Sequence, residues 1–349
     1  MTIQVTMYDT STLLGLYREV PAPSNYFRSL FVANVVNFTD EYIDFGKLRE
    51  GRKLAPLVVP TVQGRPVYSE ASSVSRFKAA YLKPKDPISP SRLIKRRPGE
   101  NLLAPNQLTP KARFSAILGD IMRTHRETIE RRVEWLTAKA ILDGKVTLEG
   151  PDYPRVVLDF GRDASHTVVK TTNFWDDVDF DIMAELQTWI DRVRRAKFGG
   201  PVNRLTVGAN VIGPMLKNKS ILKQLDLQTR GTNASLNTGL REGDYVEYVG
   251  KLGPNLELWV NSDFYELPDG STENFQDPND VLLSGPNVLG VEAYGAILDD
   301  EANYQAMAVF PKMWPQKDPS AIFVMSQSSP LFVPVNPNNT LKATVLAAK

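Results

Sequence analysis

Apolar side chains recur every three or four residues between residues 110 and 143, the longest periodic stretch in the chain. The stripe consists of Phe114, Leu118, Ile121, Ile129, Val133, Leu136 and Ala140, with His125 among them. This spacing predicts one amphipathic helix over residues 110–143, about 50 Å long at the usual rise per residue. Thr109 before Pro110 fits the start of a helix, and Asp143-Gly144 fits its end.

The polar face of this helix carries charges of both signs at four-residue spacing. The pairs Arg123 with Glu127, Arg126 with Glu130, and Glu127 with Arg131 are interpreted as exposed pairs that favour solvation, each by only a few tenths of a kcal/mol. Gly119 in the same helix costs about 1 kcal/mol relative to alanine. We therefore expect a packing reason for it, such as the close approach of a neighbouring backbone.

An extended pattern precedes the helix. Residues 42–48 (YIDFGKL) alternate between apolar and polar, as in a half-buried strand. Residues 54–85 indicate two strands joined by a turn at Gly64, with prolines that confine them to edges or irregular pairing. A two-stranded projection is at best marginally stable in water. We expect it to lie on another surface, such as a second copy of the chain.

The remainder of the chain mixes strand and helix signals. Helices are expected at about 178–197 and 210–226, and the predicted strands are 145–150, 153–169, 204–209, 244–250, 256–260, 263–267, 306–310, 321–329 and 340–346. Residues 1–35 combine short apolar groups with a PAP sequence, which is typical of an arm that docks on something. The pattern as a whole predicts an α+β fold.

Composition narrows the function classes. The 349 residues are 42% hydrophobic and carry a formal net charge of +1, which argues against wrapping a polyanion or coating a membrane. The chain has no cysteine, which excludes disulfides, thiolate metal sites and cysteine nucleophiles. The sequence shows no secretory signal and no long uncharged apolar run. We expect a soluble protein that is not exported.

Candidate catalytic and metal-binding residues each have a simpler explanation. His125 lies on the apolar stripe and fits a core or interface histidine, and His166 has no partner at ligand spacing. The aspartates of WDDVDFD, from Asp176 to Asp181, fit the start of a helix, although a metal-dependent enzyme remains an alternative reading. GANVIGPM has the glycine spacing of a phosphate loop without its lysine. We expect no catalytic residue, no metal and no cofactor.

One strongly basic segment stands out in the nearly neutral chain. YLKPKDPISPSRLIKRRPGE (81–100) contains Lys83, Lys85, Arg92, Lys95, Arg96 and Arg97 against Asp86 and Glu100. Prolines hold it extended, and no aromatic residue interleaves with the arginines. A contact between subunits is the favoured reading. A solvated loop and a phosphate-binding segment are the alternatives.

The order of these elements resembles that of the major capsid proteins of tailed bacteriophages, which share the Hong Kong 97-like fold. The likeness is greatest to the lambda-type family called phage major capsid protein E. The stretches that carry it are SSVSRFKAAYLKPKDPISP with LIKRRPGE, LDGKVTLEG, VVLDFGR, LDLQTRGTNASL, AYGAILDDEA and FPKMWPQKDPSAIFVMSQSSPL. Together they extend over nearly the whole chain from about residue 25.

The resemblance implies a division into regions and a function. The regions are an N-terminal arm (1–45), an extended loop with its return (46–100), a peripheral domain with a spine helix (101–175), an axial domain (176–300), and a return to the peripheral domain (301–349). The implied function is self-assembly into an icosahedral head shell that encloses packaged double-stranded DNA. The alternative within this fold is an encapsulin-like shell that stores a cargo protein.

Partners and interface residues follow from the same resemblance. The chain is expected to form pentamers and hexamers of itself, to meet a scaffold protein, a portal and a decoration protein, and to contact DNA only weakly, without any membrane. It would be a virion component assembled in the bacterial host cytoplasm, without covalent cross-links and without enzyme activity. The expected interface residues are Arg76, Phe77, Tyr81, Lys83, Lys85, Arg96, Arg97, Arg230 and Gly231.

Overall fold

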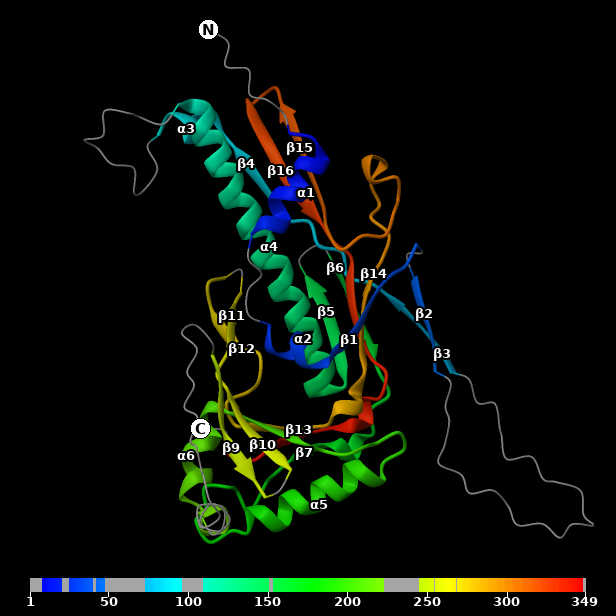
Figure 1. Ribbon diagram of the computed structural model, residues 1–349, viewed down its shortest axis with the longest axis vertical. Coiled ribbons are helices and arrows are strands. Elements are labelled where there is room, and N and C mark those ends of the chain that lie inside the picture. The colour runs from blue at the N-terminus through cyan, green and yellow to red at the C-terminus, as the bar shows by residue number, and fades with distance from the viewer. Residues whose placement is uncertain are drawn as a thin grey trace, which may run out of the picture.

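The protein is elongated, and one helix runs along most of its upper half (Figure 1). This is a computed structural model that describes residues 8–20, 25–39, 42–47, 73–95, 109–150, 153–222, 245–253, 255–267 and 269–347. The long helix, α4, spans Pro110–Asp143, as the sequence predicts. The Thr109 side chain accepts a hydrogen bond from the N–H of Ala112 at its start. Gly144 ends it in the left-handed conformation (φ 68°).

The upper end of α4 packs against a three-stranded antiparallel sheet. The sheet has the order β15 (Phe310–Gln316), β16 (Ala321–Gln327), β4 (Lys85–Ile88). Two short helices lie beside it, α1 (Thr10–Glu19) and α3 (Pro90–Ile94). Apolar side chains from α1, α4 and this sheet form one buried cluster, which includes Leu13, Met122 and Val324. The N-terminal segment is thereby packed into the body of the protein.

The lower half of α4 belongs to a second buried cluster. It packs there against helix α2 (Tyr26–Phe31) and against a sheet of three strands, β1 (Val32–Asn37), β14 (Gly290–Tyr294) and β17 (Pro330–Pro334). The hairpin of β5 (Lys145–Gly150) and β6 (Tyr153–Asp159) follows directly after α4. This middle region therefore joins segments from both ends of the sequence.

The lower end of the molecule is a separate layer with its own apolar cluster (Figure 1). A mixed six-stranded sheet has the order β7 (Thr167–Val169), β18 (Thr340–Thr344), β13 (Asp280–Ser284), β8 (Arg204–Gly208), β10 (Leu256–Asn261), β9 (Val246–Leu252). Helices α5 (Ile182–Arg195) and α6 (Ala209–Lys217) contribute buried side chains to the same cluster. A small hairpin pairs β11 (Phe264–Glu266) with β12 (Thr272–Asn274).

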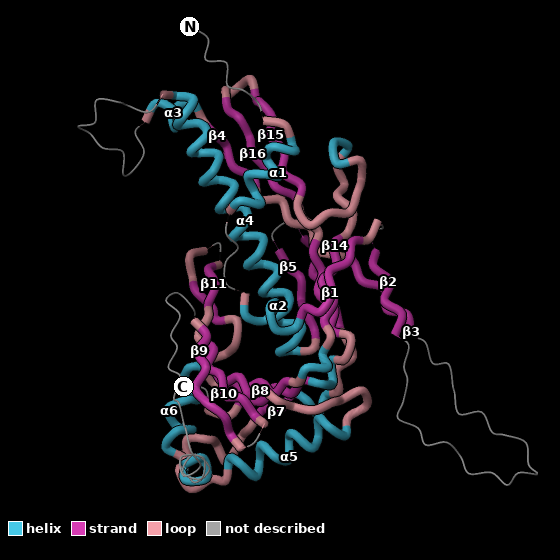
Figure 2. The backbone as a smooth tube through the Cα atoms, in the orientation of Figure 1, coloured by secondary structure: helices cyan, strands magenta, loops and turns pink. Residues whose placement is uncertain are grey.

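Two strands project from the side of the body, as Figure 2 shows. They are β2 (Tyr42–Lys47) and β3 (Ser73–Lys78), which pair in antiparallel fashion. The strand predicted at 42–48 is confirmed. The turn predicted at Gly64 and the prolines near it lie outside the described residues.

Three predicted elements differ in the structure, and each difference has a local cause. The strand predicted at 153–169 is divided into β6 and β7 by a short 3₁₀ helix at Ala164–His166, where the Asp163 side chain accepts a hydrogen bond from the N–H of Ser165. The helix predicted over 210–226 is interrupted at Asn218, whose backbone is extended (ψ 133°). Its side-chain oxygen accepts a hydrogen bond from the N–H of Ser220, as the N-cap of the following helical turn does. The strand predicted at 306–310 instead covers Phe310–Gln316. The prolines at 311 and 315 argue against a strand in the sequence. Proline is tolerated on an edge strand, however, and β15 is an edge of its sheet among the described strands.

Gly119 inside α4 and Gly144 directly after it give a matched stability prediction. Gly144→Ala is expected to lower the free energy of unfolding by about 2 kcal/mol, because alanine is strained in the left-handed conformation. Its Cβ would also lie 2.7 Å from the Arg162 side chain. Gly119→Ala is expected to raise the free energy by about 0.5–1 kcal/mol, because among the described residues nothing outside the helix backbone lies within 4 Å of its Cβ.

Urea unfolding of the two single variants and the parent protein measures both changes. If the Gly119→Ala monomer is more stable but no longer assembles, the close backbone approach that the sequence predicts at Gly119 occurs between copies of the chain. A destabilised Gly119→Ala monomer would contradict the structure at this position.

Candidate functional site

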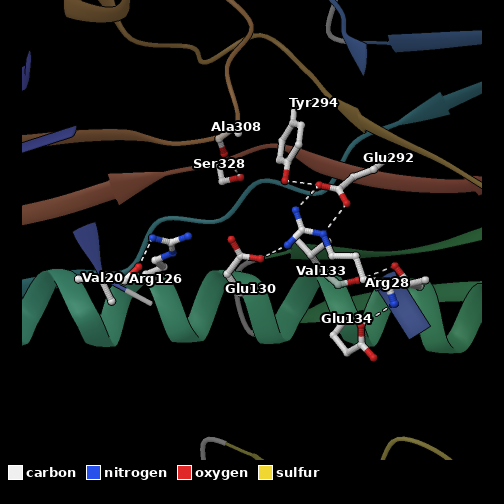
Figure 3. A network of polar contacts seen from close by, with 11 residues as sticks. Val20, Arg28, Arg126, Glu130, Val133, Glu134, Glu292, Tyr294, Ala308 and Ser328 are labelled. Carbon is white, nitrogen blue, oxygen red and sulfur yellow. Dashed lines mark hydrogen bonds and ion pairs between the residues drawn. The ribbon is translucent and has the colours of Figure 1, made fainter. Parts of the chain in front are cut away.

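Three charged side chains at four-residue spacing on α4, Arg126, Glu130 and Glu134, hold the N-terminal segment of the chain (Figure 3). Four residues advance a helix by slightly more than one turn, so the three side chains lie along one stripe. We call them the α4 charged stripe. Each of them contacts a different part of the described residues 17–20 and 26–28.

Arg126 binds the C-terminal end of α1. One terminal nitrogen of its guanidinium donates hydrogen bonds to the carbonyls of Tyr17 (2.8 Å), Arg18 (3.1 Å) and Val20. The guanidinium also lies over the Tyr17 ring, 5.3 Å from its centroid. The last carbonyls of a helix have no partner within the helix and carry partial negative charge. Arg126 therefore stabilises the end of α1 and fixes it on α4.

Glu134 binds the N-terminal end of a helix, α2. Its two carboxyl oxygens accept hydrogen bonds from the backbone N–H groups of Phe27 (2.6 Å) and Arg28 (2.9 Å), in the first turn of α2. Asn25, the N-cap residue of α2, makes no such side-chain bond. A carboxylate near a helix N-terminus is favoured by the helix dipole. Glu134 thus caps α2 from a residue more than a hundred positions further along the chain.

Arg28 completes the joint between the N-terminal segment and the body. It makes two parallel bonds to Glu292 of β14, Nε to Oε2 at 2.6 Å and Nη2 to Oε1 at 2.8 Å, and its other terminal nitrogen pairs with Glu130. The Glu292 side chain is fully buried and also accepts from the Tyr294 hydroxyl. Burial alone would lower the pKa of Arg28, but the two carboxylates raise it. The joint therefore connects α2, α4 and β14 through one guanidinium.

The pKa of Glu134 makes this joint sensitive to pH. Burial raises it from 4.5 to about 7, with a smaller contribution in the same direction from Asp263, while the two N–H bonds and the charge of Arg28 oppose the change. A group whose pKa is higher in the folded state binds an additional proton there between the two pKa values. Its contribution is complete below about 4.5 and is lost as the pH rises through about 7.

The free energy of unfolding is therefore expected to decrease between pH 4.5 and about 7, by on the order of 3 kcal/mol from Glu134 alone. Glu134→Gln keeps an oxygen acceptor and cannot titrate, so this part of the pH dependence should disappear in the variant. Urea unfolding of both proteins at a series of pH values measures it. Parallel pH curves for the parent and the variant would contradict the assignment.

Three of the predicted interface residues make contacts within the subunit. The Tyr81 hydroxyl donates to Gln327 Oε1 and accepts from the N–H of Leu298, both at 2.9 Å. Lys83 lies over the Tyr81 ring. Lys85 lies over the Phe323 ring, 4.1 Å from its centroid, on the face of β16. These three residues lie close together at the edge of the upper sheet, and their role between subunits stays a prediction.

Of the six other predicted interface residues, the structure describes only two. Arg76 and Phe77 lie in β3, where their backbones pair with Asp44 and Ile43 of β2. Arg96, Arg97, Arg230 and Gly231 lie outside the described residues. The structure therefore leaves the interface assignment of these six residues as a prediction.

Both histidines are satisfied inside the fold. His125 Nδ1 lies 3.0 Å from the Ser326 hydroxyl, and its Nε2 lies 3.1 Å from Asp86 Oδ2. His166 Nδ1 lies 2.8 Å from the Thr340 carbonyl. Burial lowers the pKa of both histidines. Ser326, His125 and Asp86 are thus connected in the order of a serine-hydrolase triad. The side chains of Ser326 and His125 are both buried, which leaves no access for a substrate. The prediction of a core histidine at this position is confirmed.

Of the aspartates from Asp176 to Asp181, one caps a helix, as expected. Asp181 accepts a hydrogen bond from the N–H of Ala184 in the first turn of α5, and Asp177 accepts one from the N–H of Asp179. Within the residues that the structure describes, no group of three or more candidate ligands could hold a metal ion. The structure gives the metal-dependent alternative no support at this position.

The α4 charged stripe differs from the sequence-based prediction. Its spacing predicts an exposed pair of Arg126 and Glu130, but Arg126 instead binds the end of α1 and Glu130 binds Arg28. Charged side chains at four-residue spacing fit a solvent-exposed helix face and a face that binds another segment equally well. The adjacent buried positions Ile129 and Val133 were the available signal that this side of the helix is covered.

Comparisons with known proteins agree with one another over almost the full chain. The model of the family described as phage major capsid protein E matches residues 9–345. The major capsid protein of Enterobacteria phage P21 is 27% identical over 342 residues, covering 95% of this chain and 97% of that protein. The major capsid protein of Escherichia phage lambda is 27% identical over 343 residues, covering 96% and 98%.

Solved structures give the same fold. A crystal structure titled as a prophage capsid protein of Escherichia coli CFT073 superimposes with a TM-score of 0.73 at 25% identity, covering 98% of this chain and 100% of that one. The mature capsid of bacteriophage PhiM1 has a TM-score of 0.53 at 12% identity over 100% of this chain and 93% of that one, a likeness of fold. The expected α+β capsid fold of the Hong Kong 97-like type is confirmed. No helix among the described residues is long and apolar enough to cross a membrane. The chain belongs to the phage major capsid protein E family.

Proposed function

We propose that the chain is the major capsid protein of a tailed bacteriophage, which self-assembles into an icosahedral head shell around packaged double-stranded DNA. The observation that carries the proposal is the family match over residues 9–345. Relatives named major capsid proteins also cover the chain almost from end to end. As a member of a structural family, the chain acts by forming contacts between copies.

Features of the single subunit support assembly. The ribbon of β2 and β3 projects from the body, and two strands alone are only marginally stable in water (Figure 2). Within the described residues, β1 is an edge of its sheet, and its Val35 side chain is 59% exposed. Exposed edges and apolar groups of this kind are stabilised when another chain covers them. In a closed shell, each copy covers its neighbours.

The finer partners are proposed from the family resemblance. They are pentamers and hexamers of this chain, a scaffold protein, a portal, a decoration protein and weakly held DNA, in a virion assembled in the bacterial cytoplasm. The net charge of +1 is consistent with a wall that does not bind DNA tightly. This proposal includes the five regions, from the arm at 1–45 to the return at 301–349. It also includes interface roles for Arg76, Phe77, Tyr81, Lys83, Lys85, Arg96, Arg97, Arg230 and Gly231.

The contents of purified particles test the proposal. We expect particles produced together with the neighbouring phage genes to contain nuclease-protected double-stranded DNA. The alternative, an encapsulin-like shell, would instead contain one cargo protein in a constant ratio to the shell protein. Nuclease treatment followed by DNA quantification, with mass spectrometry of the proteins, separates the two outcomes.

A further inference from the structure

A small rigid loop at the upper end of the protein exposes acidic and apolar side chains together. We call residues 296–306 the acidic tip. Its two ends are joined by a bridge between Ala296 and Ala306, and the N–H of Ile297 donates to the Gln305 carbonyl. Ile297 and Ala302 are buried in a small cluster with Phe310 beneath it. Compact loops with closed ends and internal packing are frequently functional.

The base of the acidic tip is held by side chains from three other segments. Asp299 pairs with Lys312 of β15 and accepts a hydrogen bond from Gln327 of β16 at 2.6 Å. The Tyr81 hydroxyl, also bonded to Gln327, accepts from the N–H of Leu298. Tyr81 is therefore a positioning residue for the tip within its own subunit.

The upper part of the acidic tip has a strained backbone and an apolar surface. Asn303 and Tyr304 both have left-handed conformations, with φ of 50° and 54°. Such residues persist where the surroundings determine them, and they cluster at functional sites. Leu298 is 53% exposed and Tyr304 57% exposed, next to the exposed carboxylates Asp300 and Glu301. The tip thus presents two large apolar groups with negative charge.

A surface with the opposite charge lies at α3, and we call it the basic corner. Ile94 is 78% exposed and is flanked by the exposed side chains Arg92 and Lys95. The buried Arg113 of α4 donates to the carbonyls of Leu93 and Ile94, which fixes α3 on the end of α4. The basic corner is therefore also a preformed surface.

The acidic tip and the basic corner cannot meet within one subunit. In Figure 1 the tip is the orange turn to the right of β15, and α3 lies on the opposite side of the upper sheet. Each surface combines an exposed apolar group with charge of one sign, and the two signs are opposite. Two different surfaces on opposite sides of one molecule are suited to a head-to-tail contact that closes into rings.

We propose that the acidic tip of one copy docks on the basic corner of a second copy, with Leu298 and Tyr304 packing against Ile94. This inference rests on the proposed assembly function and names a contact for it. It also gives the basic segment 81–100 a partner of defined chemistry.

Reversal of charge on each side tests the pairing. Asp300→Lys with Glu301→Lys is expected to reduce the assembled fraction by about tenfold or more, because like charges then face each other. Arg92→Glu with Lys95→Glu should have the same effect. All four changes in one chain restore opposite charges and should restore assembly. Loss of assembly that the fourfold variant does not recover, in a protein with an unchanged near-ultraviolet circular dichroism spectrum, would argue against the contact.

Introduced cysteines test the contact directly, since the chain has no cysteine of its own. Ile94→Cys with Tyr304→Cys should form disulfide-linked trimers and larger species in oxidised particles, because each copy links to two neighbours. Either cysteine alone can give at most a dimer. Ile94→Cys with Val169→Cys, an exposed position on β7 in the lower sheet, is the matched control. Particles that form normally but give no ladder above the control overturn the contact alone. An unsubstituted chain that never assembles overturns the proposed function as well.

Discussion

Arg28→Met is expected to lower the free energy of unfolding by about 3–5 kcal/mol, the usual cost of removing one partner from a buried ion pair. Glu292 would lose both of its bonds from the guanidinium while its side chain stays fully buried. Glu130 would lose its partner on α2 at the same time. The N-terminal segment would then be held mainly by Arg126, Glu134 and apolar packing.

A second substitution separates two contributions to the lost stability, the unpaired charge left at Glu292 and the loss of the Arg28 side chain itself. Arg28→Met combined with Glu292→Gln leaves no unpaired charge at Glu292, and glutamine still accepts from the Tyr294 hydroxyl. The double variant should recover at least half of the lost stability. Urea unfolding of the parent, both single variants and the double variant completes the cycle. Equal stability of Arg28→Met and the parent would show that the joint contributes nothing to the fold.

Arg96→Glu together with Arg97→Glu is expected to leave a folded monomer that no longer assembles. Residues 81–100 carry six basic and two acidic side chains, which acidic groups of a neighbouring copy would attract. The prediction that the prolines hold the whole segment extended is wrong, because Pro90 begins the short helix α3 (Pro90–Ile94), and proline is favoured in the first turn of a helix. Reversing two charges converts attraction into repulsion at every copy of the contact, and the effect is multiplied because the copies engage simultaneously. Loss of assembly should therefore be nearly complete.

A control with the same change in net charge is needed for this experiment. Arg155→Glu with Arg194→Glu changes exposed side chains in β6 and α5, whose ion pairs are long and solvent-exposed. Sedimentation measures the assembled fraction, and thermal unfolding shows whether each monomer is folded. Normal shells from the Arg96 and Arg97 variant would contradict the interface role of the basic segment.

Elements with dense local signals could be predicted from the sequence. The sequence predicts helix α4 with both ends, because seven apolar positions, an N-cap threonine and a terminal glycine all agree. The sequence predicts strand β15 at the wrong residues, because Pro311 and Pro315 oppose a strand unless it lies at an edge. Whether a strand lies at an edge depends on the topology of the sheet, which local residue patterns do not contain.

The joint at Arg28 could not be predicted for a related reason. Its members come from α2, α4 and β14, and the separation between Arg28 and Glu292 is more than 260 positions. Arg126 and Glu130 have the same spacing as a solvated surface pair, and only the docked N-terminal segment gives them other partners. Tyr81 likewise acquires its role from Leu298 and Gln327, which lie far along the chain.

Particle formation by the 349-residue chain tests the assembly function most directly. The chain is expressed alone and together with the neighbouring scaffold gene, and the products are separated by size-exclusion chromatography and viewed by negative-stain electron microscopy. A capsid protein is expected to give capsomers or closed icosahedral shells in at least one of the two conditions. A stable, folded monomer that forms neither under either condition would contradict it.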